Sequence, residues 1–236
     1  MSESRPRVVL TGAAGRIGRA IAPQLAPRWD LHCTDLQPDG EIAVLDVTDL
    51  EACRSAFTAA SAVVHLAAVP DPGATWEQLL PANVIGVYNV ARAAADAGVR
   101  RLVLASSLHA VGALPEGTQR RADDPARPGN LYGASKAWAE AIGSWISAEA
   151  PISVVALRIG WFFEQRPALD DVSPFALSAW LSARDAAELV RAAVECDGID
   201  FVVAHGISAN RFRFAELEQT MDRIGYQPVN DAFRDD

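Results

Sequence analysis

The sequence predicts an α/β fold built on a doubly wound parallel sheet, and three observations favour it. Short apolar segments alternate with segments of helical spacing along the 236 residues. The apolar segments are almost continuous, as in strands that are covered on both faces. A glycine-rich turn joins the first apolar segment to the first helical one. Strands that alternate with helices in this way pair in parallel through right-handed crossovers.

The expected strands are short runs rich in aliphatic residues. In chain order they are Val8–Leu10, Asp30–Thr34, Ile42–Leu45, Ala62–Leu66, Leu102–Ala105, Ile152–Arg158 and Phe201–Ala204. Helices are expected between them, at residues 16–26, 49–59, 76–97, 130–148, 183–196 and 214–224. The segment 76–97 shows the three- and four-residue spacing of a helix face, and Ser182 is a suitable N-cap for the helix at 183–196.

Loops rich in proline and glycine follow three of the strands. They span Pro70–Gly73, Leu114–Gly129 and Gln165–Pro174. Ligands of open α/β sheets bind beyond the carboxyl ends of the strands, which is where these loops are expected. We therefore expect a single Rossmann-type domain over residues 1–236, with helices on both faces of the sheet and a small C-terminal substrate-binding part. Its substrate-pocket segments are expected mainly at 108–130, 161–182 and 205–236.

Composition and charge exclude several classes of protein. The formal net charge of −9 argues against nonspecific nucleic-acid binding. No apolar run is long enough to cross a membrane, and the N-terminal residues lack the apolar core of a secretion signal, so a cytoplasmic location is expected. The three cysteines are expected to be reduced thiols, and the spacing of the histidines and cysteines predicts no metal site.

Three glycines form the loop after the first strand. Gly12, Gly15 and Gly18 stand where the chain must turn sharply into a helix. Without a Cβ, the backbone N–H groups can approach a pyrophosphate, and the helix N-terminus faces its charge. Asp35 ends the next strand about twenty residues on, where an acid accepts hydrogen bonds from an adenosine ribose. The loop and the acid together predict a dinucleotide site rather than a plain glycine-rich turn.

The choice of cofactor depends on charge at the end of the second strand. Asp35 would repel the 2′-phosphate of NADP, so NAD is the expected cofactor. Arg16 and Arg19 lie near the same end and would counter this repulsion, unless they only solvate the surface of the first helix.

A tyrosine and a lysine share one face of the helix expected at 130–148. Tyr132 and Lys136 are four positions apart, so their side chains lie side by side. A nearby ammonium favours the phenolate, which predicts a Tyr132 pKa below its usual value near 10. Tyr132 could then exchange a proton with a substrate oxygen near neutral pH. Ser107, just beyond the strand Leu102–Ala105, can hold that oxygen, although an ordinary surface pair and a polar turn would give the same pattern.

These motifs together resemble the short-chain dehydrogenase/reductase superfamily, in its extended, epimerase/dehydratase-like branch. The resemblance covers residues 7–210, and its markers are the three glycines, Asp35, Asp46-Val47, His65–Ala68, Asn83, Ser106-Ser107, Tyr132, Lys136 and Arg158–Gly160. It implies a cofactor bound by Gly12, Gly15, Arg16, Ile17, Gly18, Asp35, Asp46, Val47, Leu66, Ala67, Ala68, Tyr132, Lys136 and Ile159. It also implies four catalytic residues: Ser107, Tyr132, Lys136 and Asn83.

The resemblance assigns each of these four residues a role. Ser107 would orient the substrate oxygen, and Tyr132 would act as the general acid/base. Lys136 would tune Tyr132 and hold the nicotinamide ribose. Asn83 would support a proton relay by fixing the neighbouring helix.

Within that branch the sequence is most similar to uronate dehydrogenases, which oxidise the anomeric hydroxyl of a uronic acid to a lactone with NAD. The similarity is carried by Ala105–Gly112, Leu131–Lys136, Ala179–Ser182 and Gly206–Asn210. It implies a substrate pocket that contains Pro70, Leu108, His109, Trp161 and Phe175.

Four of these pocket residues depart from the family pattern. Leu108 stands in place of an Asn, Trp161 of a small polar residue, Phe175 of a carboxylate-binding Arg and Pro70 of a Ser. An aromatic ring does not replace a bidentate guanidinium, so the resemblance implies a less polar pocket than that of a uronate dehydrogenase. A cation from a shifted loop is the alternative, supplied by Arg166, Arg211 or Arg213.

The expected function is hydride transfer between NAD and a hydroxyl or carbonyl carbon of a small-molecule substrate. A sugar-nucleotide epimerase or dehydratase is the alternative enzyme, but only about seventy residues follow Arg158–Gly160, few to enclose a nucleotide-sugar. A non-catalytic NAD(P)-binding sensor is the alternative from another class. We also expect a homo-oligomer, a dimer through the helices of Asn83 and Tyr132. Trp138 and Trp145 suit that contact, and equally suit packing on the sheet.

Overall fold

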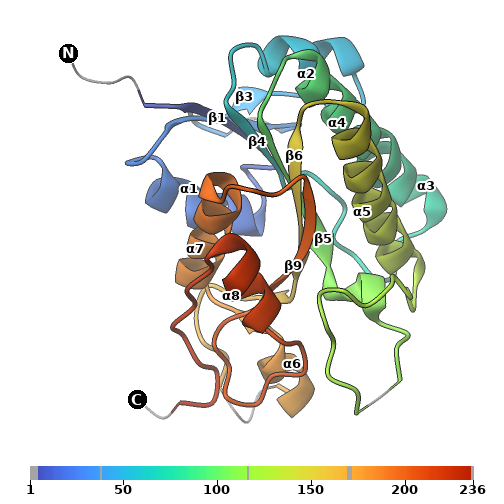
Figure 1. The fold of residues 1–236 in the computed structure, drawn as a ribbon, viewed down its shortest axis with the longest axis vertical. Coiled ribbons are helices and arrows are strands. Elements are labelled where there is room, and N and C mark those ends of the chain that lie inside the picture. The colour runs from blue at the N-terminus through green and yellow to red at the C-terminus, as the bar shows by residue number, and fades with distance from the viewer. Residues whose placement is uncertain (1–4, 38, 116, 169–171, 235–236) are drawn as a thin grey trace.

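A parallel sheet of seven strands forms the centre of the structure, a computed structural model that describes residues 5–37, 39–115, 117–168 and 172–234 (Figure 1). In spatial order the strands are β3 (Ala43–Val44), β2 (Asp30–Asp35), β1 (Arg7–Thr11), β4 (Ala62–His65), β5 (Arg101–Ser107), β6 (Ser153–Ile159) and β9 (Phe201–Gly206). Every neighbouring pair is parallel. The strand order reverses between β1 and β4, which is where such sheets form a ligand crevice. The predicted fold class is confirmed.

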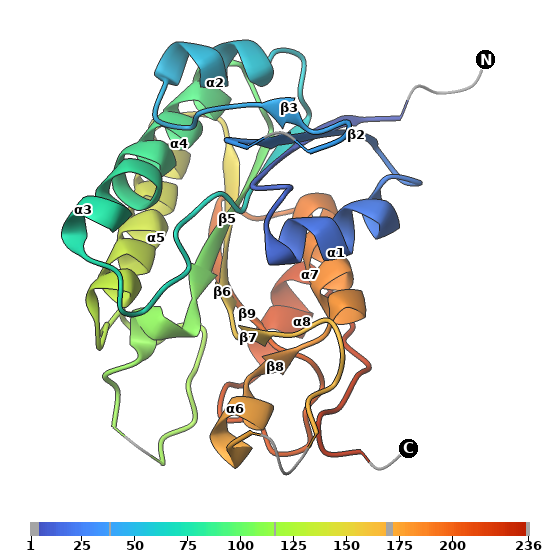
Figure 2. The same ribbon diagram turned by 180° about the vertical axis from the view of Figure 1, so that it is seen from behind.

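Helices cover both faces of the sheet (Figures 1 and 2). One face packs against α2 (Leu50–Ala56), α4 (Val87–Asp96) and α5 (Leu131–Glu149), and the other against α1 (Arg16–Leu25), α7 (Ala183–Glu195) and α8 (Glu218–Ile224). Alternate strand residues enter the two cores because strand side chains point to opposite faces. Leu102 and Leu104 of β5 are buried under α4 and α5, whereas Val103 is buried on the opposite side.

The helix expected at 76–97 consists of three pieces. They are α3 (Trp76–Leu79), the π-helical turn η1 (Leu80–Gly86) and α4. Pro81 lacks a backbone N–H, so it interrupts the regular hydrogen-bond ladder where the π-helical turn begins. The turn carries Asn83 to the inside of the molecule, where its side chain is buried.

Four short elements that the sequence did not predict lie beyond the carboxyl edge of the sheet. β7 (Trp161–Phe162) and β8 (Trp180–Leu181) form a small parallel sheet of their own, and α6 (Pro174–Ser178) lies beside it (Figure 2). The turn η2 (Leu108–Val111) follows β5 directly. In the part of the chain that the structure describes, no helix is both long and apolar enough to cross a membrane.

Candidate active site

The glycine loop between β1 and α1 has no room for a side chain at Gly12 or Gly18. Gly12 adopts a φ of +71°, and a Cβ there would lie 2.5 Å from the Ala67 backbone nitrogen. A Cβ on Gly18 would lie 2.5 Å from the Gly12 carbonyl oxygen. The loop therefore packs backbone against backbone, and the N-terminus of α1 opens into the crevice with Gly15 as its N-cap.

Two adjoining cavities follow the carboxyl edge of the sheet from this loop. The first, of about 650 Å³, is lined by Asp35, Asp46, Val47 and Ala67 among others. The second, of about 370 Å³, is lined by predicted residues that are far apart in the sequence: Arg16, Ile17, Pro70, Ser107, His109, Tyr132, Lys136, Ile159 and Trp161. Gly12, Gly15, Leu66 and Ala68 line both cavities, so the two join at the glycine loop. Every residue predicted to bind the cofactor borders this crevice.

Asp35 holds the wall of the first cavity together. One carboxylate oxygen accepts a hydrogen bond from the Ala14 backbone nitrogen at 3.0 Å, and the other from the Gln37 nitrogen at 3.2 Å. Arg19 lines the same cavity, but it is paired with Asp39 at 2.5 Å. The carboxylate of Asp35 therefore faces this cavity beside a cation that already has a partner.

Tyr132 and Lys136 lie in the second cavity with Ser107. Lys136, the only lysine of the sequence, donates a hydrogen bond to the Ala105 carbonyl at 2.9 Å, and its ammonium lies 5.6 Å from the Tyr132 ring centroid. Burial lowers the pKa of Lys136 to about 8. Ser107 accepts a hydrogen bond from the His109 nitrogen at 3.2 Å.

The expected pKa shift of Tyr132 is wrong in sign. Burial raises the pKa of Tyr132 above its usual value of 10, and only a hydrogen bond with Ser107 and the charge of Arg16 oppose this. The buried Lys136 donates to Ala105 instead of to the phenol oxygen, and burial also disfavours its own charge. Helical spacing placed the two residues together but did not show that desolvation would exceed their attraction.

Asn83 lies outside the two cavities and fixes the parts that line them. Its amide oxygen accepts from the Val69 nitrogen at 2.8 Å, and its amide nitrogen donates to the Val69 carbonyl and to the Ser135 hydroxyl at 3.1 and 3.0 Å. These bonds join the loop after β4 to the residue that precedes Lys136 on α5. Asn83 therefore contacts neither cavity directly and holds the loop after β4 against α5.

His109 is held in one orientation beside Tyr132. The Asn130 side chain caps α5 by accepting from the Gly133 nitrogen at 2.7 Å, so its amide nitrogen is the atom that faces His109 Nδ1 at 3.1 Å. Nδ1 thus accepts, and the hydrogen of the neutral ring is on Nε2. Burial lowers the pKa of His109, which favours this neutral form. The His109 and Tyr132 rings meet edge to face at 5.5 Å.

A third cavity, of about 500 Å³, extends from this point toward α6. Leu108, His109, Trp161 and Phe175 line it together, so four of the five predicted pocket residues meet there, whereas Pro70 lines the second cavity only. The third cavity shares Ser107, His109, Ile159, Gly160 and Trp161 with the second. A substrate in the third cavity would therefore reach the Ser107 and Tyr132 side of the crevice.

The three arginines named as alternative cations do not line this cavity. Arg211 is paired with Asp231 at 3.5 Å and Arg213 with Glu218 at 2.6 Å, while Arg166 bonds to the Arg234 carbonyl. Arg120 lines the cavity instead, and sequence reasoning missed it. Its loop was expected to border the pocket, but nothing in the local sequence distinguishes it from the neighbouring Arg121.

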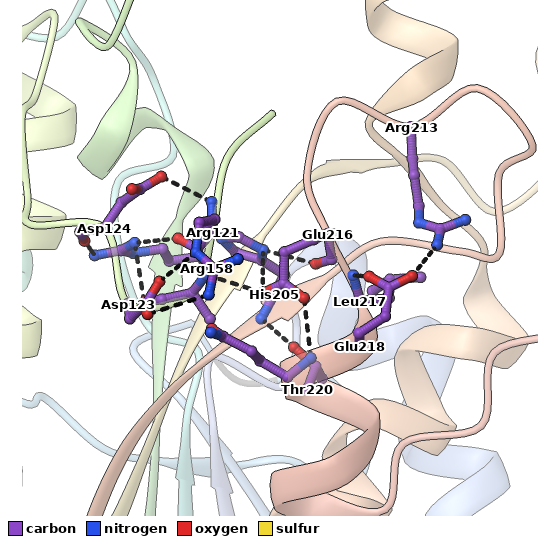
Figure 3. Close-up of polar contacts among 12 residues, drawn as sticks. Arg121, Asp123, Asp124, Arg158, His205, Arg213, Glu216, Leu217, Glu218 and Thr220 are labelled. Atoms are coloured by element: carbon purple, nitrogen blue, oxygen red, sulfur yellow. Dashed lines mark hydrogen bonds and ion pairs between the residues drawn. The ribbon is translucent and has the colours of Figure 1, made fainter. Parts of the chain in front are cut away.

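A buried polar network fixes the loop that contains Arg120 (Figure 3). Arg158 pairs with Glu140 at 2.8 Å and donates to the Asp124 carbonyl at 3.0 Å. On the other side of the loop, Glu216 accepts from the Ala122 nitrogen at 3.0 Å. Glu140 also accepts from the Ser106 hydroxyl at 2.6 Å. The loop is therefore tied to β5, β6 and α5.

The family of this chain follows from its sequence match. Residues 8–173 match the NAD dependent epimerase/dehydratase family. The chain belongs to that family. The match covers the glycine loop, Asp35, Ser107, Tyr132 and Lys136, and it ends before α6. Among the described residues there is also no group of three or more side chains that could hold a metal ion.

Sequence matches to relatives with named activities extend over nearly the whole chain. An L-arabinose 1-dehydrogenase (NAD(P)(+)) of Haloferax volcanii is 37% identical, over 96% of this chain and 97% of its own. An NAD-dependent glucose-6-phosphate dehydrogenase of the same organism is 35% identical, over 95% and 94%. The crystal structure of uronate dehydrogenase from Agrobacterium tumefaciens is 30% identical, covers 97% of this chain and 86% of that one, and has a TM-score of 0.86. The predicted resemblance is confirmed.

Proposed function

We propose that this protein is an NAD-dependent sugar dehydrogenase that oxidises the anomeric hydroxyl of a monosaccharide. One observation supports this most directly: Ser107, Tyr132 and Lys136 border the same cavity as the glycine loop. A cavity that joins a dinucleotide cradle to a proton-transferring side chain suits hydride transfer at a carbon that bears oxygen. The named activities of the relatives, all of them sugar dehydrogenases, agree with it.

The residues present fit NAD on structural grounds. Gly12 and Gly18 let the loop pack tightly on the Ala67 backbone and on itself, and α1 presents its N-terminus to the crevice, where its backbone N–H groups can meet a pyrophosphate. Asp35 provides carboxylate oxygens for a ribose and would repel a 2′-phosphate, which favours NAD over NADP. When bound, NAD supplies the hydride acceptor.

The protein's own residues would manage the substrate oxygen and its proton. Ser107 would donate a hydrogen bond to that oxygen, which is held beside the Tyr132 phenol. In its phenolate form Tyr132 would take the hydroxyl proton and become the phenol, and the positive charge of Lys136, 5.6 Å from the ring centroid, would stabilise that phenolate before the transfer. His109, with its hydrogen on Nε2, would donate a further hydrogen bond to a substrate hydroxyl.

The Tyr132→Phe variant tests the proposal. Removal of the phenol oxygen should lower kcat about a hundredfold or more, while the affinity for NADH stays within a factor of two. NADH formation from L-arabinose, glucose, glucose 6-phosphate and glucuronate would be followed by absorbance, and NADH binding by fluorescence. Full activity of Tyr132→Phe would refute the role of Tyr132. Failure of all sugars, with NADH binding intact, would refute the proposed function.

The assembly is part of the same proposal: a dimer through α4 and α5. Tyr88 and Trp145 stack at 6.1 Å on the outer side of these helices, and each remains 40% exposed. Exposed aromatic pairs of this kind are typical of protein interfaces. Light scattering should give twice the chain mass for the wild type and the chain mass for Trp145→Glu. Identical masses for both would contradict this interface.

A further inference from the structure

The third cavity contains one charged side chain in an otherwise neutral lining. Its described lining residues include no aspartate or glutamate, and His109 is kept neutral by burial and by its bond to Asn130. Arg120 is therefore the only cation at its surface within the described residues. Apart from Ser107, His109 and Asn130, the rest of the wall is apolar, aromatic or glycine, with Phe175 packed against Phe214 at 4.6 Å between ring centroids. The electrostatic character of the cavity thus depends on Arg120.

The charge of Arg120 has no counter-ion in the described part of the chain. Its guanidinium donates to the carbonyl oxygens of Leu114, Pro115 and Thr118, at 2.8 to 2.9 Å. Carbonyl dipoles satisfy these three N–H groups but leave the net positive charge in place, and a guanidinium has five N–H groups. The side chain is only 6% exposed. A buried charge without an opposite charge is costly, and an anion in the cavity would offset that cost.

The backbone of Arg120 is fixed on both sides. Its nitrogen donates to the Phe214 carbonyl at 2.7 Å, and its own carbonyl accepts from the Glu216 nitrogen at 2.8 Å. The next residue but one, Ala122, is held by the Glu216 carboxylate. A side chain on such a frame loses little conformational freedom when it binds a ligand, which suits a recognition residue.

We propose that Arg120 binds an oxyanion of the substrate, a carboxylate or a phosphate, at the end remote from the carbon that is oxidised. This rests on the proposed sugar dehydrogenase activity and names its substrate class: monosaccharides that carry a terminal oxyanion. The third cavity shares Ser107 and His109 with the second, so one sugar can reach both Arg120 and Tyr132. Phe175 and Trp161 then form the apolar wall, and Arg120 adds the cation that this wall lacks.

The test compares binding of charged and neutral sugars to four proteins: the wild type, Arg120→Met, Arg120→Lys and Arg121→Met. Each protein, saturated with NADH, would be titrated with glucuronate, glucose 6-phosphate and glucose by calorimetry. Arg121 is an exposed arginine paired with Asp123, so Arg121→Met removes one positive charge beside the cavity without altering its wall. Thermal unfolding of each variant shows whether the loop is destabilised, because Arg120 also donates hydrogen bonds to carbonyl groups there.

The wild type should bind glucuronate or glucose 6-phosphate more tightly than glucose. Arg120→Met should reduce the ratio of anionic to neutral affinity about tenfold or more, Arg120→Lys should restore part of it, and Arg121→Met should leave it unchanged. The stronger of the two anionic ligands identifies the oxyanion. An unchanged ratio in Arg120→Met, or no preference for anions in the wild type, overturns the inference. The affinity ratio is measured by binding, so it tests the role of Arg120 even if no sugar produces NADH. That outcome would refute only the proposed dehydrogenase activity.

Discussion

The Lys136 ammonium donates a hydrogen bond to the Ala105 carbonyl oxygen at 2.9 Å. This contact ties α5, which carries Tyr132, to the end of β5, which carries Ser107. The two side chains proposed to handle the substrate oxygen are thus fixed to each other through a buried cation.

The titration of Lys136 can be measured directly. Because it is the only lysine, protein labelled with ¹³C-lysine gives a single side-chain resonance. Burial lowers the pKa of Lys136 from 10.5 to about 8, so the resonance should titrate with a midpoint near 8. A midpoint above 10 would contradict the burial of this group.

The same shift predicts how stability depends on pH. Between pH 8 and 10.5 the unfolded chain binds more protons at Lys136 than the folded one, so the free energy of unfolding rises with pH across that window. At pH 7 the burial costs about 3 kcal/mol. Lys136→Met should therefore be more stable than the wild type at pH 7, and the gap should narrow toward pH 10. Urea unfolding at several pH values measures both effects, and a constant gap would argue against this linkage.

Replacement of Asn83 by leucine should affect both folding and turnover. The change leaves the Val69 N–H and C=O and the Ser135 hydroxyl without their partner, which should lower the free energy of unfolding by about 2 to 4 kcal/mol. The Tyr132 face of α5 loses its support, so kcat should fall as well. Asn89→Leu is the matched control, since Asn89 is a buried amide that holds the carbonyls of residues 47 and 48. Because Val47 and Thr48 line the first cavity, kcat is measured at saturating NAD. Asn89→Leu should then lose similar stability but retain kcat, and an equal loss of kcat in both variants would leave Asn83 without a special role.

Gly12→Ala should weaken cofactor binding. Its Cβ would lie 2.5 Å from the Ala67 nitrogen in a left-handed backbone conformation, so the loop must move away from the crevice. We expect the Kd for NADH, measured by fluorescence, to rise about tenfold or more. Gly73→Ala has an ordinary φ and its nearest neighbour at 3.4 Å, so it should bind NADH as the wild type does. If both variants bind equally well, the loop does not cradle the cofactor.

Asp35→Ser should change the preference between cofactors. The substitution removes the negative charge that would face a 2′-phosphate, while a hydroxyl remains to accept from the loop. The ratio of kcat/KM with NAD to that with NADP should fall about tenfold or more. Asp39→Asn, which frees Arg19 without touching the ribose position, should change the ratio less. A larger effect at Asp39 would assign cofactor choice to Arg19.

Local sequence patterns predicted the sheet and the crevice well. The expected strand Ile152–Arg158 and the observed β6 differ by one residue at each end, because a buried parallel strand is an uninterrupted apolar run. The glycine loop could be predicted equally well, since only glycine fits the backbone conformation at Gly12. Pro81, by contrast, lies inside a segment of helical spacing, and that spacing cannot show that three elements replace one helix.

The substrate side was less predictable because its contacts join distant parts of the chain. Arg120 lines the cavity with its backbone held by Phe214 and Glu216, which are distant in the sequence. Similarly, the pairing of Arg158 with Glu140 and the burial that raises the Tyr132 pKa are properties of the packed structure. Spacing along the sequence shows which residues share a helix face, but it does not show how much water they lose.

Because the backbone of Arg120 bonds to residues 214–216, the frame of the substrate wall cannot close before that segment has been synthesised. The glycine loop, β1 to β6 and α5, which together line the dinucleotide crevice, leave the ribosome before Phe214 does, so the crevice can form while the opposite wall still lacks its frame. Chains stopped ahead of Phe214 should accordingly bind NADH better than they select a sugar.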